Sequence, residues 1–247
     1  MLRLIRYILL GLHFVFSSTL GLLIGILRPF HPTNSMWCAH IYAFFGLPII
    51  GIKTNVEGRE NFKADEPCIV ICNHQSNWDL FVVGSIVPPR TVSLGKKSLK
   101  FIPFFGQLYW LAGNVLIDRG NRKKALEAMD ITKNALLEKN TNIWIFAEGT
   151  RNRGNNMLPF KKGAFVTAIN AGVPIIPVAC SSYLEGFSLD NWSNGMAHLK
   201  VMEKVETKDL TMDDVDALME QCHSKMLSTI HELDAREAER TAIKRSA

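Results

Sequence analysis

The segment CIVICNHQSNWD, residues 68–79, decides the fold of this 247-residue chain. Its first five residues are apolar and are bounded by Pro67 and by the polar Asn73. This pattern predicts a short strand that is buried on both faces, as strands of parallel sheets are. The polar residues that follow therefore lie beyond the end of a buried strand, where open α/β sheets place their binding residues.

Further strands are predicted where short apolar runs recur, at residues 91–94, 115–117, 142–146, 174–179 and 198–205. Apolar residues at helical spacing predict helices at residues 122–139 and 160–171, the second closed by Gly172. Thr211, with two aspartates behind it, predicts the cap of a long C-terminal helix that runs to about Arg240. The alternation predicts an α/β domain with a mixed, mostly parallel sheet flanked by helices.

The N-terminal region has the composition of a membrane anchor. Residues 7–27 carry no formal charge, and as a helix they would be roughly 30 Å long, about the thickness of a bilayer core. Arg3 and Arg6 precede this stretch and Arg28 follows it, so both ends have cations for lipid head groups. A second apolar stretch covers residues 36–52. We therefore divide the chain into hydrophobic anchoring helices, residues 1–52, and the α/β domain, residues 53–247.

Three arrangements of this anchor compete. A cleaved signal peptide is disfavoured because the apolar stretch continues past Ser17 and Thr19, where a cut would fall. A single span would place Arg3 and Arg6 outside the cell if the domain is cytoplasmic, against the positive-inside tendency. We favour a hairpin or a partly immersed pair of helices with both ends on the cytoplasmic face. Protease protection of a tag on Met1 in inside-out vesicles would exclude the hairpin.

Composition limits the partners and the compartment. The formal net charge is +5 with scattered basic residues, which favours anionic partners such as phospholipid head groups and argues against nucleic acid. The five cysteines are odd in number and lack C-x-x-C spacing, which argues against a disulfide framework and a zinc site. Reduced, buried cysteines are typical of a cytoplasmic domain.

The first polar cluster pairs His74 with Asp79. On a regular helix, residues five apart lie about 140° apart, so the two meet only where the chain turns from strand to helix. An aspartate bound to one imidazole nitrogen raises the basicity of the other, which can then take a proton from a hydroxyl. The alternative is a histidine and an aspartate that merely cap a helix start, and the spacing alone does not decide.

Cationic residues gather after other predicted strands. Arg119 ends the segment GNVLIDR, residues 113–119, and the segment EGTR, residues 148–151, follows another strand. Lys161 and Lys162 stand at a helix start, where exposed N–H groups also favour anions. Glycine permits a tight turn, and arginine offers forked donors to a phosphate monoester. These segments predict an anion site, with solvated surface loops as the alternative.

Together these motifs resemble the glycerolipid acyltransferase family. NHQSNWD, GNVLIDR, FAEGTRNRG and VPIIPV occur in the order and spacing of its four motifs, and the resemblance covers nearly the whole chain. Residues 95–119 and 158–178 are most similar to the bacterial branch that acylates lysophosphatidic acid. The resemblance implies a phospholipid-biosynthesis enzyme at the bacterial cytoplasmic membrane, with its catalytic domain facing the cytoplasm. It implies transfer of a fatty acyl group from acyl-CoA or acyl-acyl carrier protein to the 2-hydroxyl of 1-acyl-sn-glycerol 3-phosphate, giving phosphatidic acid.

The resemblance also implies roles for individual residues. His74 is the general base of a direct transfer without a covalent acyl-enzyme, and Asp79 orients it. The residues implied to bind the acceptor are Arg119, Glu148, Gly149, Thr150 and Arg151, with Lys96 and Lys161 as auxiliary cations. No metal or other cofactor is implied beyond the thioester co-substrate, and the oxyanion donor is not identifiable from the motifs.

Other functions remain open at this point. Within the family, the acceptor is alternatively glycerol 3-phosphate or a lysophospholipid with a larger head group. A lipid hydrolase would need a nucleophile, and the chain has no G-x-S-x-G segment, which leaves Ser76 as the serine to test. A non-enzymatic membrane adaptor on the same scaffold is disfavoured because His74, Asp79, Glu148 and Arg151 are all intact.

Overall fold

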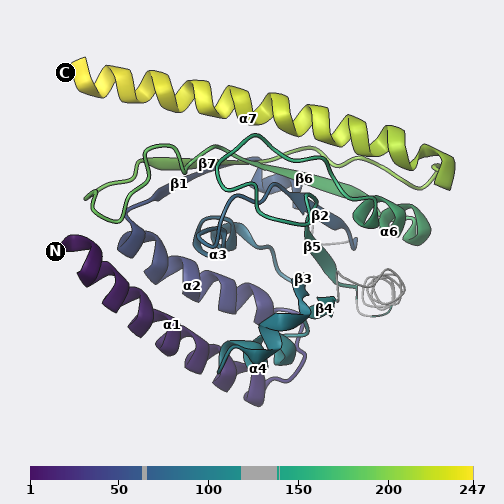
Figure 1. Ribbon diagram of the computed structural model, residues 1–247. Coiled ribbons are helices and arrows are strands. Elements are labelled where there is room, and N and C mark those ends of the chain that lie inside the picture. The colour runs from purple at the N-terminus through teal and green to yellow at the C-terminus, as the bar shows by residue number, and fades with distance from the viewer. Residues whose placement is uncertain (63–65, 118–137, 139, 247) are drawn as a thin grey trace.

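The computed structural model describes residues 1–62, 66–117, 138 and 140–246 (Figure 1). Within these residues, a seven-stranded sheet has the order β1-β7-β6-β2-β5-β3-β4. Neighbouring strands are parallel except for β6 and β7, so the predicted mixed, mostly parallel sheet is confirmed. The strands are β1 (Lys53–Glu57), β2 (Ile69–Cys72), β3 (Thr91–Lys96), β4 (Val115–Ile117), β5 (Asn142–Phe146), β6 (Ile175–Cys180) and β7 (Met196–Val201).

The sheet departs from the sequence prediction at one edge. Strand β1 was not predicted, because KTNVE contains a single apolar residue and so lacks a strand pattern. The strand expected at residues 198–205 runs instead from Met196 to Val201, and Val205 makes one separate bridge to Ile175.

The predicted helix at residues 122–139 lies outside the described residues except at Glu138, and Arg119 also lies outside them.

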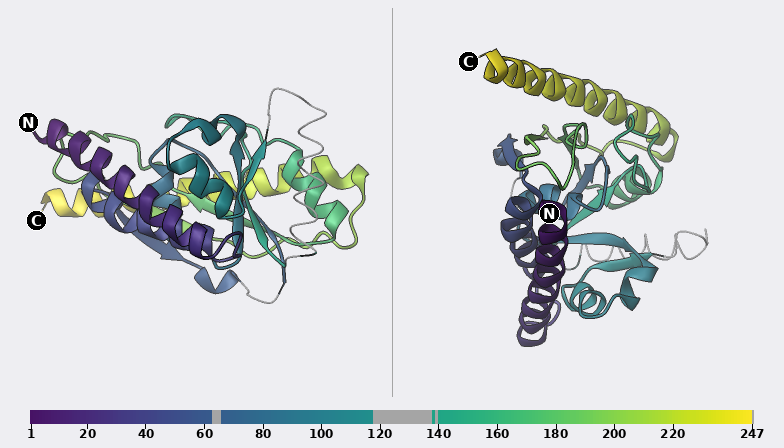
Figure 2. Two further views of the ribbon diagram at one scale, coloured as in Figure 1. Left: turned by 90° about the horizontal axis from the view of Figure 1, so that it is seen from below. Right: turned by 60° about the vertical axis from the view of Figure 1, so that its left-hand side comes forward.

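Helices cover both faces of the sheet (Figure 1). One face carries α1 (Leu2–Leu27), α2 (Asn34–Ile50), α3 (Asp79–Val82) and α4 (Phe105–Leu111), and the other carries α6 (Gly163–Ala171) and α7 (Val215–Ser246). Figure 2 shows α1 and α2 side by side on their face, with α7 running along the opposite one. Among the described residues, a large apolar core lies in each layer between sheet and helices, and a third, smaller cluster of Ala179, Ile230 and Leu233 lies between β6 and α7.

Strand β2 divides its side chains between these two cores. Val70 and Cys72 belong to the core on the α2 and α3 side, whereas Ile69 and Ile71 belong to the core on the α6 and α7 side. Successive side chains of a strand point to opposite faces, so this alternation follows from the backbone alone. His74 is two residues beyond Cys72, so the same two-residue alternation would direct its side chain toward the α3 side of the sheet.

The two N-terminal helices pack as an antiparallel pair. The imidazole of His13 contacts the backbone oxygen of Tyr42 at 3.0 Å, and a Cβ built on Gly21 would lie 3.0 Å from the Cys38 sulfur. Arg6 donates to the backbone oxygens of Leu189 and Trp192, which attaches the start of α1 to the α/β domain. Among the described residues, α1 is the helix that is long and apolar enough to cross a membrane, by length and composition.

The ends of the later helices follow the expected capping chemistry. Gly172 closes α6 in the left-handed conformation at φ 64°, although α6 begins at Gly163 rather than at residue 160. Thr211 and Asp214 form a capping box at a short 3₁₀ helix, Met212–Asp214, that leads into α7. The long C-terminal helix is therefore confirmed, and it continues past Arg240 to Ser246.

Candidate active site

His74 and Asp79 meet where the chain turns from β2 into α3. The imidazole Nδ1 lies 2.6 Å from Asp79 Oδ2, so the predicted contact between the two side chains is confirmed. Because a carboxylate oxygen accepts hydrogen bonds, Nδ1 carries the proton and Nε2 of the neutral ring has a free lone pair. The His74 side chain is 19% exposed and that of Asp79 is 2% exposed, so the imidazole reaches solvent while the carboxylate is buried.

The Asp79 carboxylate also organises the turn that precedes it. Its Oδ2 accepts the backbone N–H groups of Gln75 at 2.7 Å and Ser76 at 3.0 Å. The capping alternative is therefore also realised in the structure, since the same oxygen satisfies the turn and binds the imidazole. These bonds orient the carboxylate toward Nδ1 before any substrate arrives, which is the preorganisation that a catalytic dyad requires.

Phe146 supports the imidazole from the neighbouring strand. The two rings are stacked, with centroids 3.9 Å apart and planes 16° apart. Cys72 pairs with Phe146 in the β2–β5 register, and residues two apart on a strand share a face, so His74 emerges on the same side as this ring. Phe146 is the first residue of the motif FAEGTRNRG, which gave it no role, and the alternation of NIWIF places it with Trp144 on that side of β5.

Glu148 joins the two loops at the end of the sheet. Its side chain is buried, and its Oε1 accepts the His74 N–H at 2.6 Å while its Oε2 accepts the Leu158 N–H at 2.8 Å. Hydrogen bonds to an ionised group are roughly twice as strong as neutral ones, so Glu148 fixes the backbone from which the imidazole projects. Both oxygens of this carboxylate therefore bind the protein's own backbone.

Replacing Glu148 with glutamine is expected to change how stability depends on pH. Burial raises the pKa of Glu148 above its usual value of 4.5, and the N–H groups of His74 and Leu158 oppose that shift. The folded state then holds the carboxyl proton more tightly than the unfolded chain does, so the free energy of unfolding decreases as the pH rises from below 4.5 through the raised pKa. Glu148→Gln cannot ionise and should lose this dependence.

The same variant should also be less stable by about 1–3 kcal/mol, because its amide nitrogen faces a backbone N–H that loses its acceptor. Thermal unfolding in detergent, followed at several pH values from about 4 to 7, measures both effects. A variant with the wild-type slope between these pH values would contradict this account of Glu148.

The segment after Glu148 runs beside the His74 loop. The N–H groups of Asn152 and Arg153 donate to the backbone oxygens of His74 and Gln75 at 2.8 and 3.0 Å. Arg151 is exposed and its Nη1 donates to the Asn77 side chain, which places a guanidinium on the His74 loop. The first and third motifs therefore lie side by side in the structure.

The remaining predicted site residues lie around this edge. Gly149 adopts a left-handed backbone conformation with φ 71°, and the next residue, Thr150, is exposed. Lys161 lies against Gly149, since a Cβ built on this glycine would be 3.1 Å from Lys161 Cγ. Lys96 is the exposed last residue of β3, which is parallel to β5, so it stands at the same carboxyl edge of the sheet. The structure thus groups cations at the edge that carries His74.

Motif reasoning missed the segment that follows β6. The side-chain amide of Asn73 exchanges two 2.9 Å hydrogen bonds with the backbone of Cys180, and Gln75 Nε2 donates to the Ser181 oxygen at 2.8 Å. The Tyr183 hydroxyl lies 2.6 Å from Asp79 Oδ1. Since these partners lie more than 100 positions along the chain, only the pairing of β2 with β6 brings them together.

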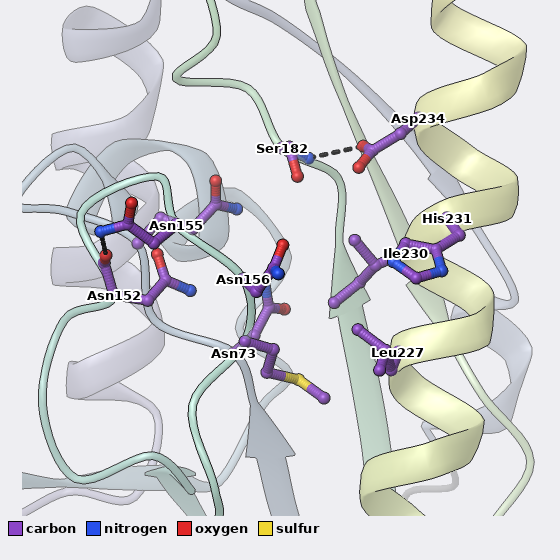
Figure 3. Close-up of a pocket in the computed structure, with 11 residues that line it drawn as sticks. Asn73, Asn152, Asn155, Asn156, Ser182, Leu227, Ile230, His231 and Asp234 are labelled. Atoms are coloured by element: carbon purple, nitrogen blue, oxygen red, sulfur yellow. Dashed lines mark hydrogen bonds between the residues drawn. The ribbon is translucent and has the colours of Figure 1, made fainter.

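A small polar cavity of about 60 Å³ lies between the His74 loop and α7 (Figure 3). Its walls include Asn73 and Gln75 from the loop and Leu227 and Ile230 from α7, but neither His74 nor Asp79. The side chains of Asn73 and Gln75 bind the backbone of Cys180 and Ser181, whereas the His74 ring stacks on Phe146, away from this cavity. Among the described residues, no group of three histidine, cysteine, aspartate or glutamate side chains is placed to hold a metal ion.

Comparison with known proteins gives a consistent likeness. A family model described as Acyltransferase matches residues 53–181. The 1-acyl-sn-glycerol-3-phosphate acyltransferase of Haemophilus influenzae is 42% identical over 238 residues, which cover 95% of this chain and 97% of that protein. The protein of the same name from Escherichia coli (strain K12) is 38% identical, with 98% of each chain covered.

A solved structure is similar over the same extent. The crystal structure of the 1-acyl-sn-glycerophosphate (LPA) acyltransferase from Thermotoga maritima matches with a TM-score of 0.72 at 25% identity, covering 94% of this chain and 97% of that one. The likeness therefore includes the N-terminal helices as well as the α/β domain.

Proposed function

The chain belongs to the acyltransferase family and is an acyltransferase, and on that premise we propose that it acylates lysophosphatidic acid to phosphatidic acid. The acyl group would come from a thioester, acyl-CoA or acyl-acyl carrier protein. The observation that carries the proposal is the 2.6 Å contact between His74 Nδ1 and a buried Asp79. This contact leaves Nε2 available as a base, and the exposed Arg151 guanidinium binds Asn77 of the His74 loop.

The proposed reaction is a direct transfer. Nε2 of His74 takes the proton from the 2-hydroxyl as that oxygen attacks the thioester carbonyl, and the tetrahedral intermediate collapses with breakage of the carbon–sulfur bond. The departing thiolate receives the proton from the imidazolium, so no net proton is gained or lost by the enzyme. Asp79 stabilises the imidazolium and holds the ring in the productive tautomer.

The cationic edge supports a phosphate-bearing acceptor. Arg151 provides a forked donor next to the His74 loop, and Lys96 and Lys161 add positive charge at the same edge. Gly149 and Thr150 precede Arg151 in the turn after β5, and we assign Arg119 to the same site from the motif. Glu148 acts in this proposal by fixing the backbone of His74.

The N-terminal helices support a lipid substrate. Helix α1 leaves large apolar side chains exposed along its length, including Leu4, Ile8, Leu12, Phe16, Leu23 and Ile26. Because the start of α1 is attached to the α/β domain through Arg6, we propose that the helix pair is immersed from the cytoplasmic side with both ends on that face. The active site would then face the leaflet that holds the acceptor.

A panel of acceptors tests the proposed function. Washed membranes that contain the wild-type chain are given oleoyl-CoA with lysophosphatidic acid, glycerol 3-phosphate or lysophosphatidylcholine, and membranes without the chain serve as the control. Phosphatidic acid should form faster than either alternative product. Preferential acylation of glycerol 3-phosphate or lysophosphatidylcholine would contradict the proposed acceptor.

Ser76→Ala is expected to keep activity within about threefold of wild type, because direct transfer needs no serine nucleophile. In the structure, the Ser76 hydroxyl oxygen accepts the Trp78 N–H at 2.9 Å and lies 3.1 Å from the Tyr183 hydroxyl. Initial rates of phosphatidic acid formation at equal protein abundance measure the effect. Abolished activity in a folded variant would favour the hydrolase-like alternative with a covalent intermediate.

A further inference from the structure

Asp79 has a hydrogen-bond partner that none of the four motifs contains. Its Oδ2 is occupied by the turn and by His74, while its Oδ1 lies 2.6 Å from the Tyr183 hydroxyl. A carboxylate accepts hydrogen bonds, so the phenol donates its single proton to Oδ1. The buried charge of Asp79 is thereby shared among four donors, and one of these comes from the segment after β6.

Tyr183 is held in place independently of Asp79. Its side chain is 4% exposed and belongs to the apolar core on the α2 and α3 side of the sheet. Its N–H donates to the Ser181 oxygen at 2.8 Å, and the side chain of Gln75 binds the same Ser181 oxygen from the His74 loop. The phenol is therefore a fixed donor rather than a mobile surface group.

The Tyr183 oxygen also contacts the Ser76 hydroxyl. Because the phenol proton is directed to Asp79, the 3.1 Å contact between Ser76 Oγ and the Tyr183 oxygen is made by the serine proton. Burial, followed by the negative charge of Asp79, raises the pKa of Tyr183 well above its usual range, so the phenol remains a donor at every pH at which the enzyme would work.

We propose that Tyr183 is a positioning residue of the His74–Asp79 dyad, donating to Asp79 Oδ1 and thereby setting the basicity of His74. This inference rests on the proposed function of His74 as a general base. A donor on Oδ1 withdraws charge from the carboxylate and weakens its attraction for the imidazolium. Without that donor, the carboxylate attracts the imidazolium more strongly and His74 holds its proton to higher pH.

While Arg151 binds Asn77 of the His74 loop, three ionisable groups of the described residues are hydrogen-bonded to His74 or to Asp79. They are Asp79 from α3, Glu148 from the turn after β5 and Tyr183 from the segment after β6, the last acting through Asp79. Glu148 binds the backbone N–H of His74, and Tyr183→Phe leaves that contact in place. A change in the titration of His74 in this variant therefore reports the lost donor on Asp79.

The test compares Tyr183→Phe with wild type over a range of pH. The acid limb of kcat/KM for lysophosphatidic acid should move to higher pH by about 0.5–1 unit, so activity below the limb falls about three- to tenfold. The KM for lysophosphatidic acid should stay within about twofold, because Tyr183 does not contact the acceptor in this account. An unmoved or lowered acid limb would overturn the inference and leave Tyr183 with a structural role.

Two further measurements make the outcome decisive. Tyr42→Phe removes the hydroxyl of another buried tyrosine, which contacts Ser18 Oγ at 2.5 Å in the helix pair, and it should leave the acid limb in place. NMR titration of labelled histidine, with the His74 signal assigned from His74→Ala, should show the same upward shift in Tyr183→Phe. This titration needs no turnover, so it tests Tyr183 even if wild type makes no phosphatidic acid, which would refute the proposed function instead.

Discussion

His74→Ala is expected to lower kcat for phosphatidic acid formation by about 10²–10⁴-fold, the usual contribution of a positioned general base. Alanine removes the Nε2 lone pair but keeps the backbone N–H that Glu148 binds at 2.6 Å, so the loop retains its anchor. The KM for lysophosphatidic acid should change little, because the phosphate is assigned to the cationic edge. Initial rates in washed membranes, normalised to protein abundance, measure both constants.

His231→Ala is the matched control for this variant. His231 is exposed on α7, which covers the face of the sheet opposite to α3, and its loss should leave kcat within about twofold of wild type. If His74→Ala retained the wild-type kcat, the histidine would be structural and the proposed mechanism would be wrong.

Asp79→Asn is expected to lower kcat by about 10²–10⁴-fold while the fold is preserved, since the loss of charge destabilises the imidazolium. The amide oxygen can still accept from His74, Gln75 and Ser76, and the amide nitrogen can donate to the Tyr183 oxygen. The phenol proton can then turn toward Ser76 Oγ, which lies 3.1 Å away. The variant therefore removes the charge and keeps the hydrogen-bond geometry.

The kcat of the Asp79→Asn variant measures the effect of the lost charge, and its thermal unfolding temperature checks that the fold is preserved. Asp190→Asn is a suitable control, because Asp190 is exposed and its carboxylate pairs with Arg3, at 2.5 Å, at the start of α1. An Asp79→Asn variant that unfolds like wild type and also turns over like wild type would show that the carboxylate charge is dispensable.

The parts of the fold that the sequence predicted are those with a strong local pattern. The apolar run of β2 and the β5 run NIWIF specify buried strands, and Thr211 and Gly172 mark helix ends. Strand β1 escaped prediction because an edge strand needs few apolar residues; its five residues show no buried face. Its place beside β7 depends on pairing partners far along the chain.

The site divides in the same way. The contact between His74 and Asp79 was predictable because the two residues are only five positions apart, at a predicted strand-to-helix turn. Tyr183 was not predicted, because it lies outside the four motifs and reaches the dyad through the β2–β6 pairing. Phe146 begins the third motif, but its stacking on His74 depends on the β2–β5 pairing and was not predicted either. The resemblance implies that Glu148 binds the acceptor, and the structure adds that its carboxylate accepts the N–H groups of His74 and Leu158. Sequence motifs identify which residues gather, but not which atoms they bind.

The release of free CoA tests the central claim most directly. Purified chain in lipid vesicles, at a concentration close to that of oleoyl-CoA, is followed for free thiol and for phosphatidic acid, with and without lysophosphatidic acid. Direct transfer to a base-activated hydroxyl predicts that CoA appears only with the acceptor and in a one-to-one ratio with phosphatidic acid. A stoichiometric burst of CoA without acceptor would instead indicate an acyl-enzyme and contradict the mechanism, and CoA release that yields no phosphatidic acid would contradict the function.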